Sequence, residues 1–205
     1  PRLLVRKLYR WLVSETDQPG DALVDPLAES FAKDYDVAKL VETMLRSNLF
    51  FSPAAYRQRV KCPIEFALGI IRGLEGMVPT ARLGTDLAEL GQDLYHPPTV
   101  KGWAGGRWWL TGSTLIGRSN LAAALLAPGK PYGDQIDPWA VAGKHDKATE
   151  ESAARFLVAL FLQGDLDQGV AEPLIKSATM GEGNPAQRLR RVAHAVVTLP
   201  EFQLA

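Results

Sequence analysis

Lys61 and Glu65 are the residues whose types and spacing come closest to a catalytic pair. On a helix, residues four apart lie about one turn from each other on the same face. Glu65 could then act as a general acid or base, while Lys61 or Arg107 holds an anionic group. We favour a structural explanation, because Glu65 follows Cys62 by three residues, as the acid of a capping box does, with Lys61 as its ion-pair partner.

The aromatic segment, residues 91–115, supplies a second group of candidates. It contains three of the five tryptophans and two consecutive prolines, without a helical or strand period. Exposed indole faces suit a sugar or a planar ligand, and nearby polar side chains could fix its hydroxyl or anionic groups. Alternatively, the tryptophans are buried, as indoles usually are, and fix the segment to the surrounding helices. The candidate ligand-binding residues are Gln92, His96, Trp103, Arg107 and Trp108.

Other constellations that carry chemistry are missing from the sequence. The three histidines, His96, His145 and His194, are isolated and lack the ligand spacing of a zinc site. No glycine-rich phosphate loop and no nucleophile elbow occurs. Cys62 is the single cysteine, and a thiol without an identified basic partner indicates an inert residue. We therefore expect no metal and no cofactor.

Helical periodicity recurs along the chain, and strand alternation is absent, so the sequence predicts an all-α fold. The first amphipathic stripe includes Leu4, Leu8 and Leu12. A cap followed by proline at the first helical position predicts helix starts at Pro53, Pro63 and Pro185. Residues 127–149 are rich in Pro, Gly and Asp and predict a long loop. A second apolar stripe contains Leu23, Leu27 and Phe31, and a third runs from Leu40 to Leu49 in a helix capped by Asp36. The other helices are expected at 82–93, 114–126, 150–163 and 168–179.

The two ends of the chain resemble each other. Residues 2–50 and 154–202 each predict three helices, with an acid-Pro-Leu triplet in the second: Asp25-Pro26-Leu27 in one and Glu172-Pro173-Leu174 in the other. Apolar positions of the first and third helices fall opposite each other at one offset. We interpret this as an internal duplication, in which two three-helix units flank a central module rich in Trp, Pro and Gly.

The totals limit the classes of partner and the domain count. Lys plus Arg and Asp plus Glu are both 23, a zero formal charge that argues against a nucleic-acid binder. No apolar run is long enough to span a membrane. We expect one compact body with an N-terminal part (1–60), a central part (61–149) and a C-terminal part (150–205). Because Pro1 already lies inside a helical pattern, we expect a fragment of a longer protein.

Four segments carry a family resemblance: residues 61–66 (KCPIEF), 91–94 (GQDL), 97–103 (PPTVKGW) and 105–108 (GGRW). They resemble the bacterial family called domain of unknown function 1800, specifically the C-terminal half of its typical members. The resemblance implies an exported, extracytoplasmic protein, often found beside a sulfatase-like protein. The family has no agreed catalytic residues, but the resemblance points to eight positions: Lys61, Glu65, Gln92, Pro97, Pro98, Gly102, Trp103 and Trp108. Cys62 departs from the serine usual there.

Two functions of different kinds follow. The first is a non-catalytic binding or assembly module that acts with a sulfatase-like partner protein or a glycan. The alternative is an extracytoplasmic enzyme that acts on acidic or sulfated polysaccharide through Glu65 and Lys61 near the aromatic segment. A purely structural component of the cell envelope is a third possibility. Exposed tryptophans would favour binding, whereas burial of all three would argue against it.

Overall fold

The computed structural model describes residues 1–205, which form ten α-helices and two short 3-10 helices. The only β-pairing is an isolated antiparallel bridge between Val60 and Leu204. The all-α prediction is therefore confirmed. None of the ten helices combines the length and the apolar character needed to cross a membrane.

The chain divides into two compact units, which we describe separately. Unit 1 comprises Pro1–Val60 with Leu204–Ala205, and unit 2 comprises Lys61–Gln203. The expected boundary near residue 60 coincides with this division. The expected boundary at 149/150 instead falls inside unit 2, where helices from both sides of it share one hydrophobic core.

Unit 1 is built on three helices, α1 (Arg2–Leu12), α2 (Asp21–Phe31) and α3 (Val37–Leu45), each in contact with the other two. The Asp36 carboxylate accepts a hydrogen bond from Lys39 N (3.1 Å) and so caps α3. Because each helix is amphipathic, one apolar face of it packs against the other two helices. The small core consists of Val5, Val24, Ala28, Phe31, Leu40 and Met44.

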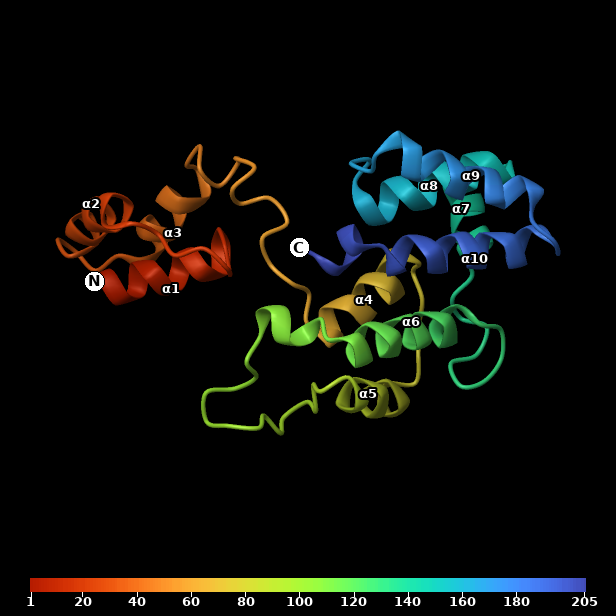
Figure 1. Cartoon of the computed structure of the whole chain (residues 1–205), viewed down its shortest axis with the longest axis horizontal. Coiled ribbons are helices and arrows are strands. Elements are labelled where there is room, and N and C mark those ends of the chain that lie inside the picture. The colour runs from red at the N-terminus through yellow and green to blue at the C-terminus, as the bar shows by residue number, and fades with distance from the viewer. The chain divides into compact units, whose positions relative to one another are not determined.

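Unit 2 holds the remaining helices around one larger core. Its central element is α10, which packs against α6, α7, α8 and α9 (Figure 1). The core thus joins helices that are far apart in the sequence. The elements are α4 (Pro63–Gly73), α5 (Thr80–Glu89), η1 (Gly106–Trp109), α6 (Gly112–Leu126), α7 (Pro138–Lys144), α8 (Glu150–Leu162), α9 (Gln168–Met180), α10 (Pro185–Thr198) and η2 (Pro200–Gln203).

Proline at the first helical position marks helix starts correctly at α4 and α10, but the helix expected from Pro53 is absent, because residues 51–57 form turns. Proline costs no hydrogen bond there, because the first-turn N–H groups have no partner within the helix. At α10 the Asn184 side chain also accepts a hydrogen bond from Gln187 N (2.9 Å). Local side-chain chemistry is therefore enough to start these two helices.

Two further local expectations were wrong. Residues 127–149 were expected to be a loop, but α7 lies among them, because Asp137 accepts from Trp139 N (3.0 Å) and Pro138 follows as the first helical residue. Helix α6 begins at Gly112, two residues earlier than expected. Its cap is Thr111, whose hydroxyl accepts from Thr114 N (3.2 Å). In both cases the capping residue sets the first residue of the helix, and that cap was not identified from the sequence.

Three helices pack against one another at each end of the chain, α1–α3 in one unit and α8–α10 in the other. The middle helix of each set contains an internal proline, Pro26 or Pro173. Some buried positions also correspond, since both Val5 and Leu157 are buried. Because amphipathic helices resemble each other easily, the internal duplication stays a prediction.

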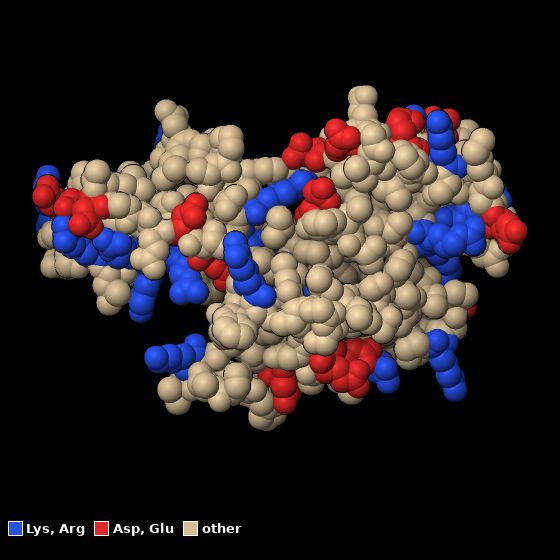
Figure 2. All heavy atoms as spheres, viewed as in Figure 1, with Lys and Arg blue, Asp and Glu red and all other residues tan.

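Charged side chains on the face drawn in Figure 2 form small groups of both signs, separated by uncharged surface. This distribution matches a chain with 23 basic and 23 acidic residues. A group of Lys and Arg side chains lies over α10, to which Arg188, Arg190 and Arg191 belong (Figure 2). Any electrostatic preference of this protein is therefore local.

Candidate functional site

The aromatic loop, defined here as residues 91–111, leaves α5 and returns to α6 as an open excursion (Figure 1). Its first end is fixed by Gln92, whose side chain is only 7% exposed. The Gln92 Oε1 atom accepts a hydrogen bond from Ile64 N (2.9 Å), one of the free first-turn donors of α4. Gln92 therefore connects the loop to α4, and the structure assigns this candidate ligand-binding residue a structural contact.

The second end of the loop is fixed by Trp109, which is 8% exposed. Gly91 has a φ of +89°, and a Cβ atom there would lie 3.8 Å from the Trp109 ring, so the two ends of the loop lie side by side. The Thr114 hydroxyl donates to the Trp109 carbonyl oxygen (3.0 Å). A buried indole and a side chain of α6 thus hold the return of the loop.

Between these ends, the loop exposes large apolar side chains. Trp108 is 74% exposed and Tyr95 is 94% exposed, and Val100 is fully exposed. Arg107 and His96 are also exposed, whereas Trp103 is half-buried. We call Tyr95, Val100 and Trp108 the apolar loop residues. The three tryptophans therefore have three different environments, and only Trp108 presents most of its surface to solvent.

A turn orders the middle of the loop. The Gly102 N–H donates to the Thr99 carbonyl (2.9 Å), and the Thr99 hydroxyl donates to the Gly102 carbonyl (3.2 Å). Gly102 has a φ of +87°, in the left-handed region that glycine adopts without strain. These local bonds order the turn that carries Val100.

Lys61 and Glu65 are engaged in holding the backbone. Glu65 Oε2 accepts a hydrogen bond from Cys62 N (2.9 Å), which is the acid half of a capping box. The Lys61 ammonium donates to the Phe202 carbonyl (2.9 Å) and lies 4.0 Å from the centre of the Phe202 ring. The Glu65 contact matches its expected capping role, whereas the ion pair between Lys61 and Glu65 stays a prediction.

Arg118, a charged residue that lies in the interior of unit 2, was not singled out from the sequence. Its side chain is 1% exposed, and its guanidinium donates to Gln203 Oε1 (3.0 Å) and to the Lys61 carbonyl (2.6 Å). Its Nε atom is buried without a hydrogen-bond partner. Burial lowers the pKa of Arg118 to about 10. Its spacing from Leu121, Ala122 and Leu125 is the signal that places it on the buried face of α6.

Cys62 lies beside this buried group at the start of α4. Burial raises the pKa of the Cys62 thiol, which keeps it protonated and unreactive near neutral pH. The described residues contain no group of three or more His, Cys, Asp and Glu side chains arranged as metal ligands.

A cleft of about 360 Å³ lies between α5 and α6, at the base of the aromatic loop. Glu89, just before the loop, and Ser113, just after it, both line the cleft. Asp86, also in its wall, accepts hydrogen bonds from the Tyr132 hydroxyl and from Arg82 Nε (3.2 Å). The base of the loop thus carries polar side chains, while its exposed part carries apolar ones.

A family model described as "Protein of unknown function (DUF1800)" matches residues 1–204. The match covers all the segments that carry the resemblance in the sequence. Neither a search of functionally curated proteins nor a search of solved structures gives a match. The family description names no activity, so a functional proposal has to be argued from the site.

Proposed function

We propose, from the premise that this chain belongs to the DUF1800 family, that it is a non-catalytic binding or assembly module that acts with a partner protein. The observation that carries the proposal is the aromatic loop, which is fixed at both ends and exposes Tyr95, Val100 and Trp108. Large apolar side chains left exposed on a loop whose ends are fixed indicate an interaction surface.

The physical argument concerns the cost of binding. Tyr and Trp dominate the energetics of protein interfaces, because they bring a large contact area with few rotatable bonds. A segment already held by Gln92 and Trp109 loses less conformational entropy on binding than a disordered one. Lys101 and Arg107, both exposed on the same loop, supply the polar rim that interfaces use around apolar contacts.

The setting and the partner form part of the same proposal. The family resemblance implies an extracytoplasmic protein found beside a sulfatase-like protein, and we propose such a protein as the partner. A glycan is the second candidate ligand, because the cleft at the base of the loop offers Glu89, Ser113 and Asn120 to hydroxyl groups.

The catalytic alternative has less support in the geometry. It needs Glu65 and Lys61 to face a substrate, but Glu65 accepts from Cys62 N and Lys61 donates to the Phe202 carbonyl. The test is cleavage of heparin, chondroitin sulfate and alginate, measured as new chain ends, by the wild type and by Glu65→Gln. We expect no turnover. Turnover by the wild type that Glu65→Gln abolishes would establish the enzyme instead.

The binding proposal is tested by affinity capture from the native cell envelope, followed by mass spectrometry. Trp108→Ala removes an apolar loop residue, and Trp11→Ala is the matched control, since Trp11 lies in unit 1 and is 72% exposed. We expect Trp108→Ala to lower recovery of the partner about tenfold or more, as loss of an interface hot spot does. Equal recovery with both variants would exclude the loop as the contact.

A further inference from the structure

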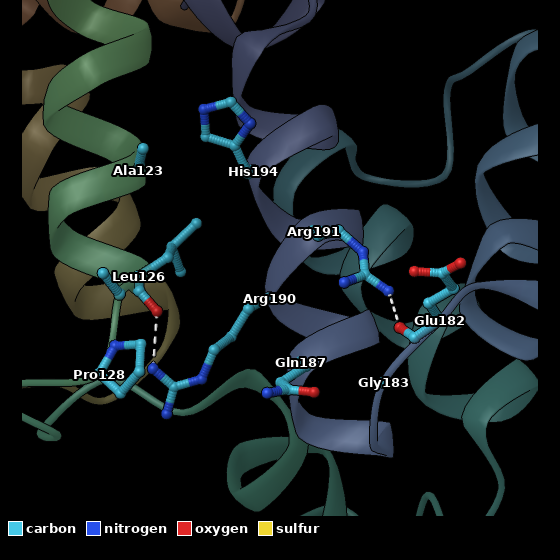
Figure 3. A pocket seen from close by; sticks show the side chains of 10 residues that line it. Ala123, Leu126, Pro128, Glu182, Gly183, Gln187, Arg190, Arg191 and His194 are labelled. Carbon is cyan, nitrogen blue, oxygen red and sulfur yellow. Dashed lines mark hydrogen bonds between the residues drawn. The ribbon is translucent and has the colours of Figure 1, made fainter.

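A groove of about 770 Å³ lies between α6 and α10 (Figure 3). Ala123 and Leu126 of α6, with Pro128 beyond its end, form an apolar wall. Helix α10 supplies the opposite wall, which includes Arg190 and Arg191. An apolar surface with a few fixed polar groups, in a space of this size, is the usual form of a small-molecule site. The groove lies outside the aromatic loop and the function proposed for it.

Arg190 is held in place at one side of the groove. Its Nη1 atom donates to the Leu126 carbonyl (2.7 Å), one of the free carbonyls at the end of α6, and Figure 3 shows the side chain directed toward Leu126 and Pro128. The Asp137 carboxylate lies 3.8 Å from its Nη2 atom, too far for a hydrogen bond. Arg190 is therefore fixed by a neutral carbonyl and lies at ion-pair distance from a carboxylate, so it serves mainly as part of the groove wall.

Arg191 extends to the other side of α10 and donates to the carbonyl oxygen of Glu182 (Figure 3). It forms no ion pair with a carboxylate. A guanidinium has five N–H donors, so this single bond leaves donors available to a ligand. The Glu182 carboxylate also lines the groove and opposes an anion there. Of the other polar groups of the groove, Gln187 is neutral, and His194 Nε2 is already engaged with the Ser119 carbonyl at 3.1 Å.

We propose that this groove binds an organic carboxylate carried on an apolar chain. The chain would cover Ala123, Leu126 and Pro128, and the carboxylate would pair with Arg191. Carboxylates and guanidinium groups form strong charge-assisted hydrogen bonds because their geometries match. Two sources share this chemistry, a free fatty acid and the carboxyl terminus of an apolar peptide.

The experiment titrates the protein with octanoate and follows backbone amide shifts by NMR. Octanamide is the uncharged counterpart, and N-acetyl-leucyl-leucine tests the peptide source. We expect shifts at Ala123–Ala127 and at Gly183–His194, and octanamide should bind about threefold or more weakly, the size expected for one exposed ion pair. Octanoate and the dipeptide compared with each other identify the source.

Two substitutions with opposite expected effects on the affinity for octanoate make the test specific. Arg191→Gln should weaken octanoate about threefold, and Glu182→Gln should tighten it by a similar factor. Arg155→Gln is the control, since Arg155 lies on α8 and pairs with Glu151 and Glu172. Thermal unfolding checks that the variants are folded. Octanamide equal to octanoate, no effect of Arg191→Gln, or shifts only outside α6 and α10 would each overturn the proposal.

Discussion

Arg118 is a charged side chain buried inside unit 2. It donates to Gln203 Oε1 and to the Lys61 carbonyl, and so joins α6 to the start of α4 and to η2. The desolvation of a charge in this place is offset by charge-assisted hydrogen bonds and by the ring of Phe66, whose centre lies 5.3 Å away. The residue therefore stabilises the fold only while its partners are present.

Replacing Arg118 by Met should lower the free energy of unfolding by about 3 kcal/mol, because two acceptors lose a charged donor. Urea unfolding measures the change. The double variant Arg118→Met with Gln203→Met should cost less than the sum of the single variants, because the pair interacts directly. Additive losses would contradict the contact.

Cys62 offers a pH-dependent prediction. Burial raises the pKa of its thiol, so at pH 8 the folded protein holds less thiolate than a free cysteine does. Alkylation by iodoacetamide should therefore be slower than in the urea-unfolded chain, and the rate should rise at a higher pH in the folded protein. Equal rates at pH 8 in both states would contradict the raised pKa. The same sign means that folding stability falls as pH rises past the unfolded pKa.

At the scale of elements, the two adjacent tryptophans of η1 have opposite roles. Trp109→Ala should destabilise the protein by about 3 kcal/mol, because a buried indole leaves a cavity and releases the return of the loop. Trp108→Ala should change stability by no more than about 0.5 kcal/mol, as exposed substitutions do. Urea unfolding of both variants tests the assignment, and a reversed order would disprove it.

A cap followed by proline predicted the helix starts at Pro63 and Pro185, but the same pair at Ser52-Pro53 starts no helix. Asp137-Pro138 is also a cap followed by proline, but it lies in a segment whose Pro and Gly content predicts a loop, so α7 was missed. The capping role of Glu65 could be predicted because it follows Cys62 by three residues. Contacts between distant segments could not be predicted, because no local sequence pattern links Gln92 to Ile64 or Arg190 to Leu126.

At the scale of the whole molecule, the two units differ in the size of their cores. Unit 1 buries six apolar side chains in its cluster, and unit 2 buries thirty. Because stability grows with the apolar surface removed from water, local opening in unit 1 should cost less free energy. Hydrogen exchange should therefore be faster in α1–α3 than in α8 and α10, and mass spectrometry of peptide fragments can measure it. Slower exchange in unit 1 would contradict this account.

The central claim is that this protein contacts its partner through the apolar loop residues. The most direct measurement places a photoreactive benzoylphenylalanine at Trp108, and separately at Met180, which is 84% exposed at the end of α9. After irradiation in the native cell envelope, we predict a cross-linked partner from position 108 and none from position 180. Cross-links of equal yield from both positions, or from position 180 alone, would contradict the claim.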